Sequence, residues 1–273
     1  TMGSLGTVST GTQTGGNSTK YDGQTPTAYE EIDDGGASSL SSNYVGNWMD
    51  NNSVIYTSPS FELEGVTATV HVEYTPEATG SSPNDGGTVT SDNWGSGQSL
   101  GLTLSGHGAT FGIYGAEREI NGQAAGGAQN TFTGVWYANY SMGPVSVGYS
   151  SSYHDQGTQG AAATAVSAKL IGTATGIFET EQYSLAFNVN DNLSISYAKA
   201  EDTYDAQGGA ITGATAVADV TMDMKSIQAA YSMGAMSIKA YRTETSNANY
   251  STSAANGLGG DNTTTEIALG LAF

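Results

Sequence analysis

The stretch that decides the fold reads Val66-Thr67-Ala68-Thr69-Val70-His71-Val72-Glu73-Tyr74. Every second residue, from Val66 to Tyr74, is apolar, and the residues between them are polar or charged. Such alternation is typical of a β-strand, because successive side chains of a strand point to opposite faces. The stretch therefore predicts one strand with an apolar face and a polar face.

The same alternation recurs along the chain, and helical periodicity is nearly absent. An all-β fold follows, in a single domain that covers residues 1–273. We predict twelve strands, at approximately residues 2–11, 51–58, 65–75, 97–106, 109–117, 131–141, 144–154, 177–190, 192–200, 221–232, 235–245 and 263–273.

The connections between these strands alternate between short and long. Residues 106–109 and 190–192 are short turns, whereas residues 74–97 and 201–222 are long connections rich in small polar residues. Short turns at one end and long loops at the other are typical of transmembrane antiparallel β-barrels of outer membranes. The even strand number places both chain ends on the side of the short turns.

Composition excludes several classes of protein. Lys and Arg number 7 against 26 Asp and Glu, so the formal net charge is −19, which argues against a nucleic-acid partner. Cysteine is absent, so a disulfide, a thiolate nucleophile or a Cys-ligated metal is impossible. No apolar run reaches the roughly 18 residues of a membrane helix. Sixteen Tyr and three Trp argue against a disordered chain.

The last predicted strand carries a specific signal. Ile267, Leu269, Leu271 and Phe273 share one face, and the strand ends on the last residue. This resembles the C-terminal signature of outer-membrane barrels, which ends in Phe and is read by the barrel-assembly machinery. The resemblance implies that these four residues are an assembly signal and that the machinery is a partner.

A second resemblance lies near the beginning of the chain. Residues 3–8 resemble the strand that precedes the constriction loop in the general trimeric porins, and residues 47–56 and 63–70 resemble the next two strands. It implies that the chain is the C-terminal portion of a sixteen-stranded porin and covers strands five to sixteen. Residues 12–50 are then the candidate constriction loop, which folds into the barrel. No signal peptide is visible, so we expect residues to precede Thr1.

The porin resemblance implies a function. The chain would form a passive diffusion channel for small hydrophilic solutes and ions in the bacterial outer membrane, as a homotrimer in the full-length protein. It would contact membrane lipid and lipopolysaccharide, need no cofactor and have no enzymatic activity. The acids of the constriction have candidates here in Glu30, Glu31, Asp33 and Asp34.

The charges of the predicted barrel favour cations. The arginine cluster that faces the constriction acids in porins has no counterpart, since the only arginines, Arg118 and Arg242, lie near outer strand ends. With an acidic loop and few cations on the inner wall, we expect a preference for cations.

Strand parity predicts which side chains line the pore. His71, Glu73, Lys239 and Glu266 fall on the polar parity and are predicted to line it, as functional residues or as a solvated polar wall. Two lysines, Lys199 and Lys225, fall on the apolar parity near outer strand ends. We expect them either to contact lipopolysaccharide phosphates or to extend into water.

Catalytic and metal sites find little support. Residues 97–101 match the G-x-S-x-G pattern, but the surrounding sequence continues as a strand instead of turning into a helix. The three histidines lie on separate segments without metal-ligand spacing. We therefore predict no catalytic residue and no metal ligand.

Three other classes share parts of the pattern. A surface β-protein or adhesin without a pore would be rich in the same small residues, but would not need a terminal Phe. An autotransporter-type translocator would need a helix entering the barrel, and residues 12–46 are too rich in Gly and Ser for one. An outer-membrane phospholipase would need a Ser–His pair on the outer wall, and none is recognisable.

Overall fold

The structure is a computed structural model that describes residues 2–11, 16–33, 45–46, 49, 53–76, 78, 94–120, 130–155, 177–205, 219–250 and 260–272. Its strands are β1 (Thr7–Gly11), β2 (Ser53–Thr57), β3 (Phe61–Leu63), β4 (Val66–Thr75), β5 (Trp94–Gly106), β6 (Ala109–Ile120), β7 (Thr131–Met142), β8 (Val145–Asp155), β9 (Ile177–Asn190), β10 (Leu193–Asp205), β11 (Val220–Met233), β12 (Met236–Ser246) and β13 (Asn262–Leu271). Three 3-10 turns accompany them: η1 (Gly3–Leu5), η2 (Ser18–Lys20) and η3 (Ala248–Tyr250). In this described part, no helix has the length and apolar character needed to cross a membrane.

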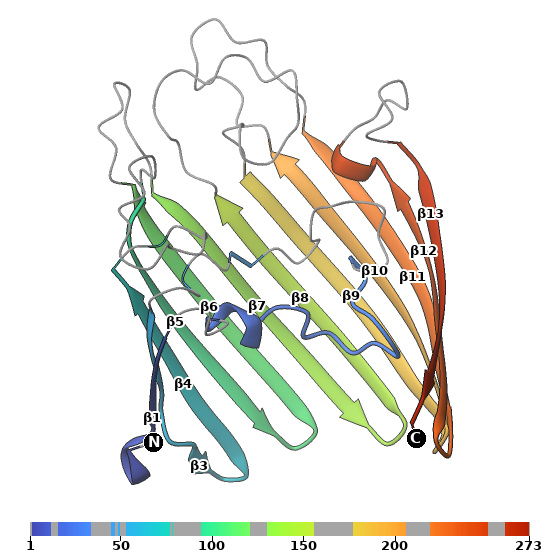
Figure 1. The fold of residues 1–273 in the computed structure, drawn as a ribbon, viewed down its shortest axis with the longest axis horizontal. Coiled ribbons are helices and arrows are strands. Elements are labelled where there is room, and N and C mark those ends of the chain that lie inside the picture. Colours follow the sequence, from blue (N-terminus) through green and yellow to red (C-terminus); the bar gives the residue numbers. More distant parts are fainter. Residues whose placement is uncertain are drawn as a thin grey trace, which may run out of the picture.

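All thirteen strands belong to one antiparallel sheet. Its order is β1-β2-β4-β5-β6-β7-β8-β9-β10-β11-β12-β13, so strands that follow one another in the chain also lie side by side (Figure 1). Only β3 lies off this path, paired with β4. Both chain ends lie at the end of the sheet where the tight turns join the strands (Figure 1).

The predicted all-β antiparallel fold is confirmed, with differences at particular elements. The first predicted strand was placed too early, because residues 3–5 form η1 and β1 begins at Thr7. The sequence predicts no strand at residues 61–63, where β3 forms, because so short a segment shows no alternation. Several strands extend beyond the prediction, as β10 does to Asp205.

The tight turns have the chemistry of β-hairpins. In the turn between β3 and β4, Glu64 and Gly65 have φ of 52° and 80°, and His107 and Gly108, between β5 and β6, have φ of 52° and 80°. Positive φ at both central residues is the type I′ pattern that matches the twist of antiparallel strands. A glycine at the second position adopts this conformation without steric cost.

The outward face of the sheet is apolar and uncovered. Side chains such as Leu100, Leu185, Ile227 and Ile267 are exposed to the extent of 61%, 47%, 65% and 73%. They belong to the alternate residues that the sequence pattern assigns to one face, and no second layer formed by the described residues packs against them. A soluble monomer rarely exposes apolar surface on this scale.

The sheet remains open in this chain. Its path ends at β1 on one side and at β13 on the other, and the two strands stand at opposite sides of the view in Figure 1. Among the described strands, β1 pairs only with β2, and β13 only with β12. Each end of the sheet therefore presents unpaired backbone groups.

Candidate functional site: the inward segment and the polar face

Residues 16–33, here called the inward segment, cross the polar face of the sheet (Figure 1). The segment begins against β4 and β5, passes β7, β8 and β10, and reaches β11 and β13. Every wall side chain that it contacts belongs to the polar parity of its strand. The segment is part of the candidate constriction loop, 12–50, of which residues 12–15, 34–44, 47–48 and 50 lie outside the described residues.

A buried carboxylate holds the start of the segment. The backbone N–H of Asn17 donates to Glu73 Oε2 at 2.9 Å, and the Ser99 hydroxyl donates to the same oxygen at 3.4 Å. The Glu73 side chain is 1% exposed. Lys20 Nζ lies close by and donates to Asn17 Oδ1 at 3.0 Å. Burial lowers the pKa of Lys20, and the charge of Glu73 opposes this shift.

Tyr21 seats the next turn of the segment. Its phenol oxygen lies 2.6 Å from His71 Nδ1, and its ring stacks on Tyr114 with a centroid separation of 5.0 Å. Burial raises the pKa of Tyr21, so the phenol stays neutral at ordinary pH. Gly101 makes room for the ring, because a Cβ there would lie 2.2 Å from the phenol oxygen.

The middle of the segment lies against β7, β8 and β10. Asn139 Nδ2 donates to the Gln24 carbonyl at 2.6 Å, and the Ala28 N–H donates to Ser196 Oγ at 2.9 Å. Between them, Pro26 rests directly on Gly148, where a Cβ would lie 2.3 Å from Pro26 Cδ. Gly148 therefore leaves the room that Pro26 occupies.

The wall of β11 and β13 fixes the following residues. Gln228 Oε1 accepts the N–H groups of Tyr29 and Glu30 at 3.0 and 3.1 Å, and its Nε2 donates to the Glu30 carbonyl at 2.7 Å. The Tyr29 phenol donates to Glu266 Oε1 at 2.8 Å, and that hydrogen bond is the main cause that raises the pKa of Tyr29 to about 12. Lys239 Nζ lies 5.0 Å from the centre of the Tyr29 ring.

A hydrophobic cluster anchors the end of the segment. Ile32 is fully buried there, together with Phe178, Ala198, Ala200, Tyr204, Val220, Met222, Met224 and Tyr250. The Tyr250 phenol, from η3, donates to Asp202 Oδ2 at 2.6 Å. Burial, with the charge of Asp202, raises the pKa of Tyr250. The turn η3, which follows β12, thus contributes Tyr250 to the cluster that holds the end of the segment.

The predicted constriction acids end up on this segment. Glu30, whose backbone is bound by Gln228, is partly exposed, and so are Glu31 and Asp33, which follow it in the sequence. Asp34 lies outside the described residues. Their part in a constriction stays a prediction.

The four predicted pore-lining residues fall into two pairs. His71 and Glu73 are buried beneath the start of the segment. Lys239 and Glu266 are exposed and meet at Tyr29, 237 residues before Glu266 in the chain. Their influence on permeation stays a prediction. The anchor Gln228 was not predicted, since a polar residue at a polar parity carries no distinguishing signal.

Carboxylates outnumber cations on the described inward surface. The acidic residues of the inward segment and the polar face are Asp22, Glu30, Glu31, Asp33, Glu62, Glu73, Asp202 and Glu266, and the lysines and arginines there are Lys20, Lys239 and Arg118. Arg118 is 7% exposed and donates to the Ala78 carbonyl at 3.1 Å. The Arg118 guanidinium group is therefore largely shielded from solvent.

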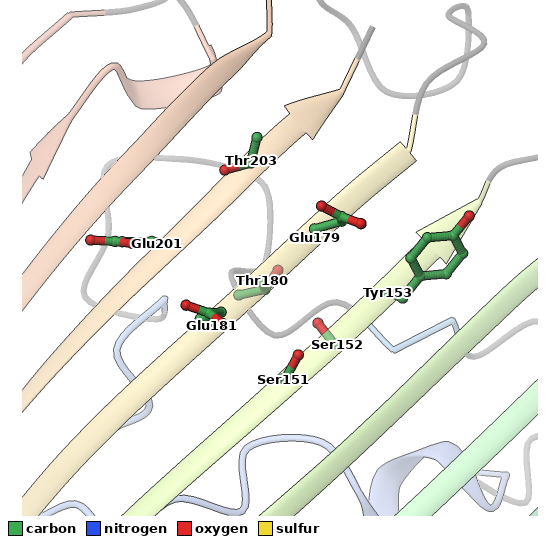
Figure 2. A pocket seen from close by; sticks show the side chains of 8 residues that line it. All are labelled: Ser151, Ser152, Tyr153, Glu179, Thr180, Glu181, Glu201 and Thr203. Atoms are coloured by element: carbon green, nitrogen blue, oxygen red, sulfur yellow. The ribbon is translucent and has the colours of Figure 1, made fainter. Parts of the chain in front are cut away.

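The outward face also carries charges at its outer end. A hollow of 380 Å³ lies between β8, β9 and β10. Its lining side chains, labelled in Figure 2, are Ser151, Ser152, Tyr153, Glu179, Thr180, Glu181, Glu201 and Thr203. The two lysines noted from the sequence stand opposite each other on β10 and β11, and Lys199 forms an ion pair with Glu201. Contact with lipopolysaccharide stays a prediction for both Lys199 and Lys225.

The remaining sequence motifs also have a structural place. Ser99 of the G-x-S-x-G match lies in the middle of β5 and bonds Glu73, so the strand makes no nucleophile elbow there. In the described ranges, no group of three or more His, Asp or Glu side chains is arranged to hold a metal ion.

The predicted assembly signal lies on the last strand. Ile267, Leu269 and Leu271 of β13 face outward and are 73%, 62% and 54% exposed. The last residue, Phe273, lies outside the described part.

Solved structures share this fold. A refined porin structure has a TM-score of 0.55 and 12% sequence identity, with 99% of this chain and 78% of that chain covered. A trimer form of OmpT, an outer membrane protein of Vibrio cholerae, has a TM-score of 0.53, 11% identity and coverages of 97% and 76%. The outer membrane channel DcaP of Acinetobacter baumannii has a TM-score of 0.50, 12% identity and coverages of 80% and 60%. No protein-family model and no curated protein sequence matches the chain.

Proposed function

We propose that this chain, which has the fold of a bacterial porin, forms the wall of a water-filled diffusion channel in an outer membrane. The observation that carries the proposal is that the two faces of one sheet suit two different solvents. Its outward face is apolar and uncovered, whereas its inward face is polar and is crossed by a tethered segment. Hydrocarbon on one side and water on the other satisfy both faces.

The geometry suits passive diffusion of small hydrophilic solutes. Within a bilayer the antiparallel ladder satisfies the backbone of each inner strand, so no polar backbone faces lipid there. Small polar side chains on the inward face leave room for water. The inward segment narrows that space, and its many contacts with the wall hold it in place against the flow of solutes.

We further propose that the channel prefers cations. Glu30, Glu31 and Asp33 stand on the segment that narrows the path, and the described inward cations are few. In a confined space with low-dielectric walls, the field of such carboxylates raises the local concentration of cations and lowers that of anions.

Reversal potentials in planar bilayers under a KCl gradient test this preference. We expect the potential to have the sign of a cation-selective pore, and the triple variant Glu30→Gln/Glu31→Gln/Asp33→Asn to lower the cation-to-anion permeability ratio by about two-fold or more. An anion-selective wild type would contradict the proposal.

A matched control separates the inward acids from net charge. The variant Glu179→Gln/Glu181→Gln removes two carboxylates from the outward face, where they line the hollow of Figure 2. Because the wall separates them from the pore, we expect the permeability ratio to stay close to that of the wild type. An equal effect of both variants would mean that the selectivity comes from overall charge.

We propose that further strands pair with the free edges of β1 and β13 and complete the barrel. Bare edges cannot face hydrocarbon, because nothing there accepts or donates hydrogen bonds. The 78% coverage of the refined porin leaves room for such strands. The proposed partners are outer-membrane lipid and lipopolysaccharide, the barrel-assembly machinery and two further copies in a homotrimer. Crosslinking in native membranes checks the trimer.

A further inference from the structure

We infer that Gln228 is the positioning residue that sets where the acidic stretch Glu30–Asp33 stands in the pore. The inference rests on the proposed channel function and adds a residue that determines its selectivity. Gln228 lies on the inward face of β11 and is 2% exposed. It is 198 residues from Glu30 in the chain, and yet it binds the backbone of the segment at the point where the acids begin.

The Gln228 amide binds the backbone of the segment much as one strand of a sheet binds the next, with an acceptor and a donor side by side. One side-chain oxygen accepts two consecutive N–H groups, from Tyr29 and Glu30, and the side-chain nitrogen returns a hydrogen bond to the Glu30 carbonyl. The same nitrogen lies 3.3 Å from Ser226 Oγ, which in turn accepts a hydrogen bond from Thr243 at 2.9 Å. The amide is therefore held on both sides, and its orientation fixes the backbone of residues 29 and 30.

An amide is the side chain that this role requires. Glutamine offers both a donor and an acceptor and carries no charge. A carboxylate would repel the Glu30 carbonyl, and a lysine or arginine could not accept the two N–H groups. A cation would also neutralise the field of the adjacent acids. The Gln228 amide holds the stretch and leaves its charge available to ions.

Gln228 lies between two neighbouring contacts of the inward segment with the wall. Toward the chain start, Ala28 is bound to Ser196, and toward the chain end, Ile32 is buried in the Tyr250 cluster. Between these points, Gln228 binds the backbone of Tyr29 and Glu30, and the Tyr29 side chain bonds Glu266. Without the amide, the backbone of these two residues loses three hydrogen bonds to the wall, and we expect it to move.

The experiment compares Gln228→Met with Gln182→Met in planar bilayers. Methionine keeps the length of the side chain but makes none of the hydrogen bonds. Gln182, on the inward face of β9, is equally buried, and no hydrogen bond joins it to residues 16–33 in the described structure. We expect Gln228→Met to raise single-channel conductance and to lower the cation-to-anion permeability ratio by about two-fold, with both values unchanged in Gln182→Met.

A combined variant tests the mechanism. In the Glu30→Gln/Glu31→Gln/Asp33→Asn background, Gln228→Met should no longer change the permeability ratio, because there is no charge left to position. If Gln228→Met keeps the wild-type ratio and conductance, the inference is wrong. If it lowers the ratio by the same factor in the charge-free background, Gln228 acts by another route and the inference is also wrong.

Hydrogen exchange and a second variant test the inference independently of ion selectivity. Hydrogen exchange of the Tyr29 and Glu30 amides should be faster in Gln228→Met than in Gln182→Met. This readout holds even if the wild type shows no cation preference, which would reject the proposed selectivity alone. Should Gln228→Met fail to fold, Gln228→Asn, which stays polar but is one methylene shorter, is expected to give the same exchange result. Protected amides in a folded variant would overturn the inference.

Discussion

At the scale of single residues, glycine and buried polar side chains decide where the inward segment lies. Gly101 and Gly148 leave two places on the wall without a side chain, and Tyr21 and Pro26 occupy them. Glycine inside a strand weakens it, but it also allows another part of the chain to approach the backbone closely. From the sequence alone, these two glycines cannot be distinguished from other small residues of the polar face.

Substitution of Gly148 tests this fit. A Cβ there would lie 2.3 Å from Pro26 Cδ and 2.4 Å from Asn139 Oδ1, so we expect Gly148→Ala to cost about 1–3 kcal/mol through overpacking and to displace the segment. Urea unfolding and single-channel conductance measure the two effects.

The matched control is Gly115→Ala on the outward face, where the nearest atom, of Phe132, would lie 3.7 Å away. That contact is ordinary, so stability should be unchanged or higher, by up to about 1 kcal/mol. A loss of stability as large as that of Gly148→Ala would show that the segment is not seated on Gly148.

At the scale of elements, strand alternation places each side chain on the polar or on the apolar face of the sheet. On β13, Ile267 faces outward and its neighbour Ala268 faces inward. The sequence alone predicts this parity, because side chains of a strand alternate with a period of two wherever the strand is regular. A charge at the two adjacent positions should therefore have very different consequences.

We expect Ile267→Arg to lower the free energy of unfolding by about 2–4 kcal/mol if the residue lies near the bilayer midplane. Ala268→Arg should change it by less than about 1 kcal/mol, since the charge reaches water. Unfolding by urea in lipid vesicles measures both variants. Equal costs would contradict the assignment of the apolar face to lipid.

At the scale of the whole molecule, the excess of carboxylates on the inward surface acts as one field. The formal charge of −19 is not evidence for this by itself, because many acids, such as Glu179 and Glu181, lie on the outward face. What matters for permeation is the subset that lies on the inward segment and on the polar wall.

Such a field depends on ionic strength. The Debye length falls from about 10 Å at 0.1 M salt to about 3 Å at 1 M, so distant charges stop acting on a permeating ion. We expect the cation-to-anion permeability ratio to fall toward one over this range, measured as reversal potentials at a constant concentration gradient. A ratio that does not depend on salt would point to a local binding site instead of a field.

The fold could be predicted from the sequence largely because its signal is local. The alternation of apolar and polar residues predicts the strands and the face on which each side chain lies. The lengths of the connections predict short turns at one end of the sheet and long loops at the other. The short β3 and the outer part of β10 were missed, since three residues show no period and outer strand ends lose their apolar members. The acidic stretch could be found as a cluster of charges, whereas its anchor Gln228 could not.

The amino-acid sequence alone predicts a sheet of antiparallel strands with one apolar and one polar face, because the period of two appears in the order of neighbouring residues. The contacts of Tyr29 with Gln228 and Glu266, which are 199 and 237 residues away, are known only from the folded chain. These contacts depend on the summed register of many strand pairs and on the curvature of the sheet. Neither quantity is expressed in any short stretch of sequence.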